Sequence, residues 1–252
     1  MKLKLNFLSK NLKSAVKSEL IFINNKNFKH KLLNQNEIIN NELFKEKKII
    51  QRNHDKSNYI FINCIEQKKS SDFENIGSKL FDFLSNNKIE NSFFNLSSIK
   101  ITNIQMERIL HGATLKSYSF EIYKTKKNIK KPININIIGK SKKNILKTKL
   151  DALSAGVFLT RDLVSEPGNI LHPDEYAKRI TQLRRIGIKV TVYDKKKLKK
   201  MGCGALLGVG QGSVRGSYLV TMEWKGTSSK TKPLAFVGKG VCFDTGGISL
   251  KP

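Results

Sequence analysis

The use of asparagine and glycine changes abruptly near residue 150, and this break constrains the fold of the 252-residue chain more than any other feature. Of the 23 asparagines, 22 precede residue 150, whereas 14 of the 17 glycines follow it. Glycine is needed where backbones approach closely or adopt positive φ, so a functional site is expected in the second part. The break predicts an N-terminal α/β domain over 1–141, a connecting helix over 142–166 and a further domain over 167–252.

Hydrophobic periodicity in the first part alternates between the strand and helix types, which favours an α/β fold. The stretch 117–123 reads as a loop or a short strand, and the polar stretch from about 26 to 56 has no assignment. Strands are predicted at 3–8, 59–65 and 132–138, and helices at 76–84 and 104–115.

The second part begins with an apolar stripe of helical spacing over 144–164, which predicts the connecting helix. Pro173 opens another helix, with acidic residues in its first turn, that ends at Gly187. Asp194 is expected to cap a short basic helix over 195–201. Strands are predicted at 188–193, 218–224 and 234–237, which together indicate a sheet flanked by helices.

The net charge is +27, and it has two competing explanations. A charge of this size favours an anionic partner such as nucleic acid or a membrane surface. However, 40 of the 47 basic residues are lysine, and lysine, asparagine and isoleucine are the residues that AT-rich coding sequences supply. A dedicated nucleic-acid binder would more commonly combine arginine with aromatic residues. The lysine run 195–200 is accordingly interpreted as a solvated helix face.

Several sequence features that would indicate a membrane location, a disulfide framework or a nucleotide cofactor are absent. No stretch of 18 apolar residues occurs, so no membrane partner is expected, and the first residues do not resemble a secretory signal. The three scattered cysteines form neither a disulfide framework nor a metal knuckle, which favours a cytoplasmic, reducing location. The glycine-rich stretch 202–216 precedes a strand instead of opening a helix, so it does not fit a dinucleotide-binding loop.

The final residues carry the strongest functional signal. The apolar run 234–237 leads into Lys239, which stands between two glycines, and Asp244 and Lys251 follow. Ligand sites cluster at strand ends in open α/β sheets. Spacing alone leaves two alternatives open, namely a surface ion pair and a site.

The segment 237–252, Val-Gly-Lys-Gly-Val-Cys-Phe-Asp-Thr-Gly-Gly-Ile-Ser-Leu-Lys-Pro, closely resembles the metal-site signature of the leucyl (cytosol) aminopeptidase family. The resemblance extends over about 107–252 and is poor before 105. It includes Arg-Asp-Leu-Val-Ser-Glu-Pro-Gly-Asn-Ile-Leu-His-Pro at 161–173 and Met-Gly-Cys-Gly-Ala-Leu-Leu-Gly-Val-Gly-Gln-Gly-Ser at 201–213. It implies a macro-like mixed sheet with flanking helices, then the first part of a zinc-exopeptidase-like α/β catalytic domain.

The resemblance also implies a function. Family members hydrolyse the N-terminal residue, preferably leucine, from peptides at a centre of two divalent ions, Mn²⁺ or Zn²⁺. Lys239 matches a metal ligand that acts through its neutral amine, and Asp244 matches the carboxylate that the two ions share. Lys251 matches the catalytic cation that stabilises the developing oxyanion. A bicarbonate acting as base and a cytoplasmic homo-hexamer are further family expectations.

The family's remaining metal carboxylates, and the arginine that holds the bicarbonate, match no residue of this chain. After Glu223 the only acidic residue is Asp244, and one carboxylate with one amine cannot hold two dications. The chain is therefore expected to be the first half of such an enzyme and to be inactive alone. Two alternatives stay open. The chain could bind DNA, as some family members do, and its lysines would make that binding nonspecific; or it could be a non-catalytic remnant.

Overall fold

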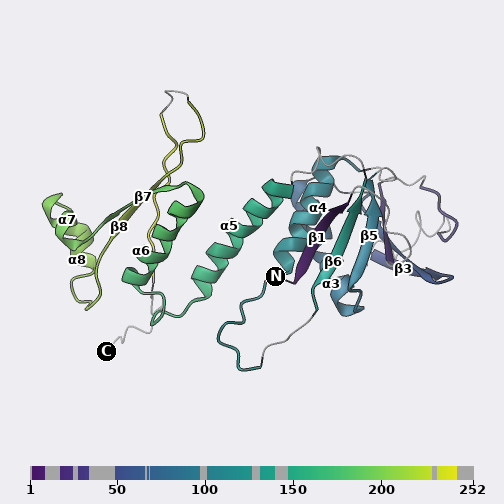
Figure 1. Ribbon diagram of the computed structural model, residues 1–252, viewed down its shortest axis with the longest axis horizontal. Helices are drawn as coiled ribbons and strands as arrows, with labels where there is room; N and C mark the ends of the chain where they lie inside the picture. The colour runs from purple at the N-terminus through teal and green to yellow at the C-terminus, as the bar shows by residue number, and fades with distance from the viewer. Residues whose placement is uncertain are drawn as a thin grey trace. The chain divides into compact units, whose positions relative to one another are not determined.

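The computed structural model divides into two compact units, Met1–Asp162 and Leu163–Pro252 (Figure 1). The residues that it describes are 2–8, 18–24, 28–33, 49–65, 67, 69–96, 101–126, 131–139, 147–228 and 232–242.

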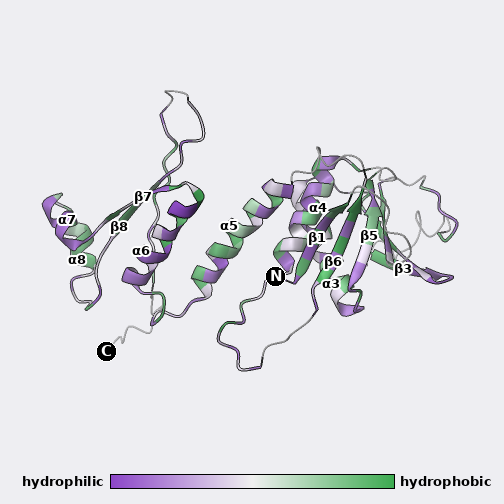
Figure 2. Ribbon diagram, in the orientation of Figure 1, coloured by the Kyte–Doolittle hydropathy of each residue, from purple (hydrophilic) through white to green (hydrophobic). Residues whose placement is uncertain are grey.

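The first unit contains a six-stranded mixed sheet, as expected from the sequence. Its strands lie in the order β1 (Leu3–Leu8), β6 (Ile133–Ile138), β5 (Asn91–Asn95), β2 (Ser18–Ile23), β4 (Ser57–Asn63) and β3 (Ile49–His54). All neighbouring pairs are parallel except β3 and β4. The predicted strands at 3–8, 59–65 and 132–138 are confirmed, whereas β2, β3 and β5 were not identified from the sequence. Figure 2 shows hydrophobic residues along β1 and β6, and the buried apolar residues of the sheet include Ile135, Ile137 and Phe94.

Two helices, α3 (Ser70–Asn86) and α4 (Asn103–Lys116), pack on each other and on the main core of the sheet, which confirms both predicted helices. A capping box starts α4: Thr102 Oγ1 accepts a hydrogen bond from Gln105 N at 3.2 Å, and Gln105 Oε1 accepts one from Thr102 N at 2.8 Å. A smaller cluster of Ile23, Leu33 and Phe61 forms a second core. Burying each large apolar side chain contributes roughly 1.5–3 kcal/mol.

Helix α5 (Lys147–Ser165) matches the predicted connecting helix, whose first residues at 144–146 lie outside the described residues. Leu150 and Ser154 are its only buried residues among those described, so most of the apolar stripe is half-buried or exposed. Polar contacts hold the helix to the first unit instead. Arg161 Nη1 donates to the Leu115 carbonyl at 2.7 Å, and its guanidinium lies 5.4 Å from the centre of the Tyr118 ring.

The second unit is built around a small antiparallel sheet. Its elements are α6 (Pro173–Thr181), the 3-10 helix η2 (Gln182–Ile186), β7 (Lys189–Tyr193), α7 (Lys195–Lys200), α8 (Gly204–Val209) and β8 (Leu219–Glu223). Gly187, at φ 89°, ends the predicted helix. Asp194 Oδ1 accepts from Lys197 N at 2.9 Å, so the predicted cap of α7 is confirmed.

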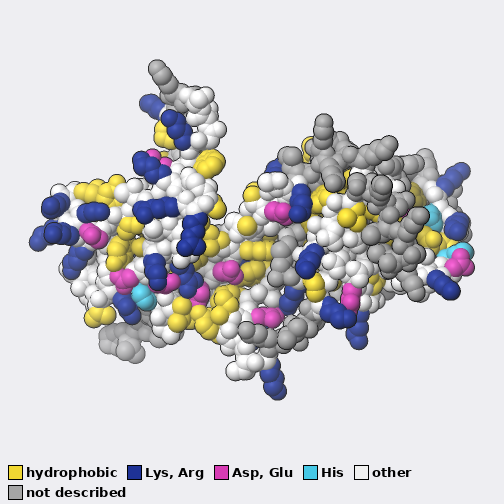
Figure 3. Space-filling view, viewed as in Figure 1, with side chains coloured by type: hydrophobic (Ala, Val, Ile, Leu, Met, Phe, Trp, Pro, Cys, Tyr) yellow, Lys and Arg dark blue, Asp and Glu magenta, His cyan; other side chains and the backbone are white. Residues whose placement is uncertain are grey.

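Charge is spread over both units, and Figure 3 shows lysine and arginine across the visible face of each. The five lysines of α7 are exposed while Leu198 is fully buried, which confirms the solvated-face interpretation of the run. No helix in the described part of the chain is long and apolar enough to cross a bilayer.

Two expectations for the second unit were wrong. The apolar run 234–237 is not a strand: it is exposed and pairs with no described strand, and a single extended segment has no ladder to join. The glycine-rich stretch contains a short helix, α8, that glycine's low helix propensity concealed.

Candidate active site

Lys239 lies in the described segment 232–242, which belongs to no helix or strand and is exposed up to Val241. The Val241 amide donates to the Lys239 carbonyl at 3.2 Å, so the chain makes a tight three-residue turn centred on Gly240. The flanking glycine Gly240 sits against the ring of Tyr176, and a Cβ at that position would lie 2.7 Å from Tyr176 Cε1. The motif therefore contacts the first turns of α6, and the absence of a side chain at Gly240 permits the contact.

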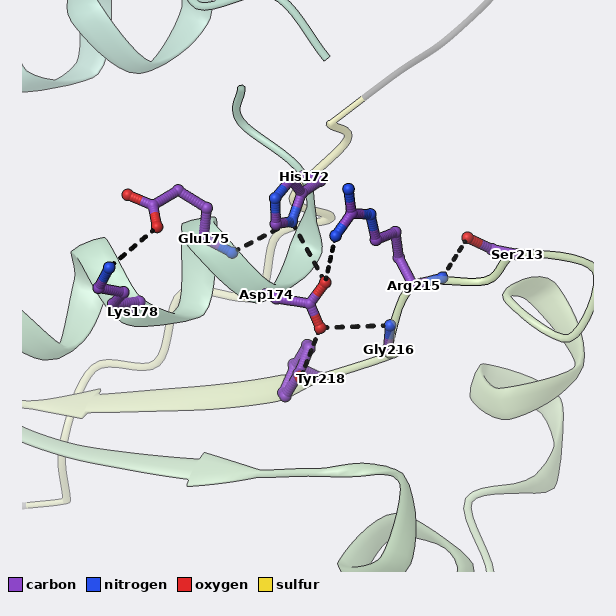
Figure 4. A network of polar contacts seen from close by, with 8 residues as sticks. All are labelled: His172, Asp174, Glu175, Lys178, Ser213, Arg215, Gly216 and Tyr218. Atoms are coloured by element: carbon purple, nitrogen blue, oxygen red, sulfur yellow. Dashed lines mark hydrogen bonds and ion pairs between the residues drawn. The ribbon is translucent and has the colours of Figure 1, made fainter. Parts of the chain in front are cut away.

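Asp174, in the first turn of α6, organises the polar network that Figure 4 shows. Its Oδ1 accepts hydrogen bonds from the Tyr218 hydroxyl at 2.7 Å and from the Gly216 amide at 3.3 Å. Arg215 Nη1 lies 4.0 Å from its Oδ2. One carboxylate thus joins the start of α6 to the end of the glycine-rich loop and the residue before β8.

These contacts change the pKa values of Asp174 and Tyr218. The hydrogen bond from Tyr218 has the largest effect and holds the pKa of Asp174 below its usual value; burial raises this pKa by less, and the Gly216 amide lowers it further. The same bond and burial raise the pKa of Tyr218. Burial also raises the pKa of the Cys242 thiol, with a smaller contribution from the negative charge of Asp174. Asp174 is therefore ionised at neutral pH and acts electrostatically on the segment that carries Lys239.

His172 caps α6, because its Nδ1 accepts from the Glu175 amide at 3.4 Å. The same nitrogen lies 3.2 Å from Asp174 Oδ2. One ring nitrogen cannot accept from the amide and donate to the carboxylate together, so the two contacts belong to different protonation forms of the ring.

A second ionic network joins α6 to Glu166 in the segment that precedes it. Arg179 Nη1 contacts Glu166 Oε1 at 2.8 Å, and its Nε contacts Glu175 Oε1 at 3.1 Å. The Glu166 side chain is only 5% exposed, so this pair is better shielded from water than an ordinary surface ion pair. Hydrogen bonds from Arg179 to Glu166 and Glu175 raise the pKa of the guanidinium.

Of the three predicted site residues, only Lys239 lies within the described part of the chain; Asp244 and Lys251 lie outside it. The described residues contain no group of three His, Cys, Asp or Glu side chains that could hold a metal ion. They therefore do not by themselves fit a binuclear centre, and the convergence of Lys239, Asp244 and Lys251 remains a prediction.

Asp174 and Tyr218 were not identified from the sequence as part of this region. The acidic residues at 174 and 175 were interpreted only as favourable charges in the first turn of a helix. Because 44 residues separate Asp174 from Tyr218, no local pattern could indicate their contact.

Residues 158–252 match the sequence model of the cytosol aminopeptidase family, catalytic domain. A probable cytosol aminopeptidase of Rhizobium meliloti is 43% identical over 170 residues, which are 64% of this chain and 34% of that protein. The corresponding protein of Brucella anthropi is 48% identical over 149 residues, 56% of this chain and 30% of that protein.

Over the matched residues the chain is similar to the cytosol aminopeptidases. It spans about a third of the length of these curated relatives. A mutant of tomato leucine aminopeptidase aligns with a TM-score of 0.65 and 18% identity, over 87% of this chain and 50% of that one. The bottromycin maturation enzyme BotP, in complex with Mn, aligns with a TM-score of 0.65 and 14% identity, over 84% of this chain and 46% of that one. Both structures share the α/β fold of the chain over the aligned residues.

Proposed function

We propose that the chain supplies the N-terminal part of a metal-dependent aminopeptidase that removes N-terminal residues, leucine preferred, from peptides. One observation carries the proposal: the match to the catalytic domain covers residues 158–252 and so includes Lys239, Asp244 and Lys251. The relatives at 43–48% identity support it.

Each of the three residues has a chemical role in this proposal. The Lys239 amine and the Asp244 carboxylate would bind two divalent ions, Mn²⁺ or Zn²⁺. When bound, such ions acidify a water molecule and polarise the peptide carbonyl. Lys251 would place a positive charge at the carbonyl oxygen, where negative charge develops during hydrolysis.

The described contacts support a positioning role for α6 in this proposal. Gly240, the residue after Lys239, packs on the ring of Tyr176. Tyr176 is itself two residues from Asp174, which hydrogen-bonds to Tyr218 and Gly216. The glycine next to Lys239 thus packs on a helix whose first turn is hydrogen-bonded to the residue before β8, which positions the backbone of this segment.

The proposed activity belongs to a complete protein. One amine and one carboxylate leave two dications short of ligands, so we propose that the 252-residue chain alone is inactive. For the complete protein we propose a cytoplasmic location, a homo-hexamer, and a bicarbonate near the metal ions.

A chimera tests the proposal. It joins this chain to the part of the Rhizobium meliloti protein that follows its matched region, and it is assayed with leucine p-nitroanilide and added Mn²⁺ or Zn²⁺. We expect hydrolysis by the chimera and none by the 252-residue chain. Hydrolysis by the chain alone would contradict the proposal that it lacks the ligands needed for activity. A folded chimera that binds metal but hydrolyses no aminoacyl anilide would contradict the proposed function.

A further inference from the structure

A cavity of about 400 Å³ lies in the first unit, between the end of α3 and one edge of the large sheet. The sheet side of the cavity is formed where three neighbouring strands begin: Lys2 precedes β1, Glu90 precedes β5, and Ile133 is the first residue of β6. Cavities of about 300–1,000 Å³ are the size that holds small organic molecules. The cavity is therefore large enough for one small ligand.

Much of the cavity wall is apolar. It includes Phe81, Leu84, Ile89 and Ile133. The backbone beside them already has partners, because the Ile133 amide donates to the Lys2 carbonyl at 2.8 Å and the Ile89 amide donates to the Leu84 carbonyl at 2.9 Å. A ligand group that rests on this part of the wall gains by being apolar, since a polar group there would give up hydrogen bonds to water.

The charged residues of the cavity are Lys2, Lys88, Lys131 and Glu90. Lys2 Nζ lies 2.9 Å from Glu121 Oε1, and Lys131 Nζ lies 3.4 Å from Glu90 Oε1. No ion pair joins the Lys88 amine to another residue in the part of the chain that the structure describes. Three cations thus face two carboxylates, which leaves one positive charge at Lys88 without a described counter-charge.

The end of α3 places Lys88 at the cavity. The Lys88 amide donates to the Ser85 carbonyl at 3.2 Å, and the next residue, Ile89, donates back to the Leu84 carbonyl. These two bonds form a Schellman motif, in which Lys88 takes the left-handed position at φ 55°. Glycine is the usual residue at this position, so the lysine keeps a cation where most helices carry no side chain. The two bonds also satisfy helix carbonyls that would otherwise repel an anion.

We infer that this cavity binds a small apolar monocarboxylate. Its apolar body would lie against Phe81, Ile89 and Ile133, and its single negative charge would meet the Lys88 amine. An amine ligand would bring a second positive charge to Lys88, and an uncharged ligand would leave that charge unbalanced. The inference concerns the first unit alone and does not depend on the proposed aminopeptidase function.

Three probes with the same eight-carbon chain test the ligand class: octanoate, octanol and octylamine. Each is titrated into the full 252-residue chain, and binding is followed by the amide shifts in its nitrogen-15 spectrum. We expect octanoate to shift the amides of 84–89 and 133 and to bind about fivefold or more tightly than the other two, as an exposed ion pair allows. Equal binding of octanol and octanoate, or octanoate shifts confined to other segments, would overturn the inference.

Variants at Lys88 test its part in binding without unfolding the chain. Lys88→Gly removes the amine but suits the positive φ, so the urea midpoint should not fall below that of the parent. Octanoate should bind this variant about two- to fivefold more weakly, whereas Lys88→Arg, which keeps the charge, should bind it as the parent does.

A matched control separates a local effect from the high net charge of the chain. Lys79→Gln removes another exposed lysine of α3, one that does not line the cavity. Its octanoate affinity should stay within twofold of the parent, and octanol should bind the parent, Lys88→Gly and Lys79→Gln equally. The same loss of octanoate affinity in Lys79→Gln and Lys88→Gly would show only general attraction of anions and would refute the site.

Discussion

The hydroxyl of Tyr218 donates a 2.7 Å hydrogen bond to the carboxylate of Asp174, across 44 residues of sequence. The bond joins the residue before β8 to the first turn of α6, the helix against which the Lys239 segment packs. It lowers the pKa of Asp174 and raises that of Tyr218, because it stabilises the charged carboxylate and the neutral phenol.

Replacing this hydroxyl should raise the pKa of Asp174 toward the ordinary value of an aspartate. A lowered pKa in the folded state stabilises the fold above the ordinary pKa, and this contribution is lost as the pH falls through the lowered value. Because the Asp174 side chain is 37% exposed, Tyr218→Phe should lower the unfolding free energy at neutral pH by about 1 kcal/mol at most. A carbon-13 carboxyl titration measures the pKa, with Tyr193→Phe in β7 as the control. An unchanged titration of Asp174 in Tyr218→Phe would show that the bond is not formed.

Helices α3 and α4 touch through two glycines. A Cβ at Gly77 would overlap the Ile109 carbonyl, and one at Gly112 would overlap the Glu74 carbonyl. Gly77→Ala and Gly112→Ala should each lower the unfolding free energy by roughly 2–3 kcal/mol, since the helices must move apart. Gly156→Ala is the matched control: nothing lies within 4 Å of its Cβ position in α5, so alanine should stabilise by about 0.5–1 kcal/mol. Urea unfolding followed by circular dichroism measures all three, and wild-type midpoints for the first two would contradict the close contact.

Glu74 links the same helices through its charge. Arg108 Nη1 donates to its Oε1 at 2.9 Å, and His111 Nδ1 lies 3.2 Å from that oxygen. Burial has the largest single effect and raises the pKa of Glu74, but the hydrogen bonds from Arg108 and His111 and their positive charges together outweigh it, so the pKa is lowered. The stabilisation is therefore present above the ordinary pKa of glutamate and is lost as the pH falls through the lowered value.

Glu74→Gln should lower the unfolding free energy by about 1 kcal/mol at pH 7 and flatten its decline in acid. Urea unfolding between pH 3 and 7 measures both effects. Glu90→Gln, which removes half of an exposed pair with Lys131, should change the free energy by roughly 0.5 kcal/mol or less. An acid decline in Glu74→Gln as steep as that of the parent would refute the assignment.

In the contiguous chimera, Asp244→Asn should lose metal and turnover together, because the shared carboxylate is the proposed bridge between two cations. Lys251→Ala should retain the metal content while turnover falls by about 10²–10³, the typical effect of one oxyanion donor. Atomic emission and anilide hydrolysis distinguish the two effects, and Lys232→Ala serves as an exposed-lysine control. Loss of metal in Lys251→Ala would assign this residue to the metal site instead.

The lysine-rich composition predicts weak and sequence-independent binding to duplex DNA. Affinity should disappear between low salt and about 150 mM salt, where the Debye length is roughly 8 Å. Fluorescence anisotropy with one defined duplex and one scrambled duplex measures it, and we expect identical salt curves. Retained preference for one duplex at 150 mM salt would favour a recognition role for the basic residues.

Elements whose cause is local were predictable from the sequence. β1 follows from alternation, α7 from the Asp194 cap, and the end of η2 from a glycine with positive φ. Each depends on residues within about one turn or one strand. A similarly short motif identified the candidate site residues Lys239, Asp244 and Lys251. It did not determine where their side chains lie in space.

Contacts between distant residues were decided only by the tertiary structure. β5 (Asn91–Asn95) is too polar to stand out, and it becomes a strand because it pairs with β6 on one side and β2 on the other. The run 234–237 has the more strand-like composition but no described partner, so it stays unpaired. The Tyr218–Asp174 bond and the contact of Gly240 with Tyr176 likewise join residues more than 40 positions apart. The sequence by itself determined the secondary structure that each segment prefers. The tertiary structure decided which segments adopt it, because a strand needs a neighbouring strand for its hydrogen bonds and an apolar side chain needs other residues to pack against.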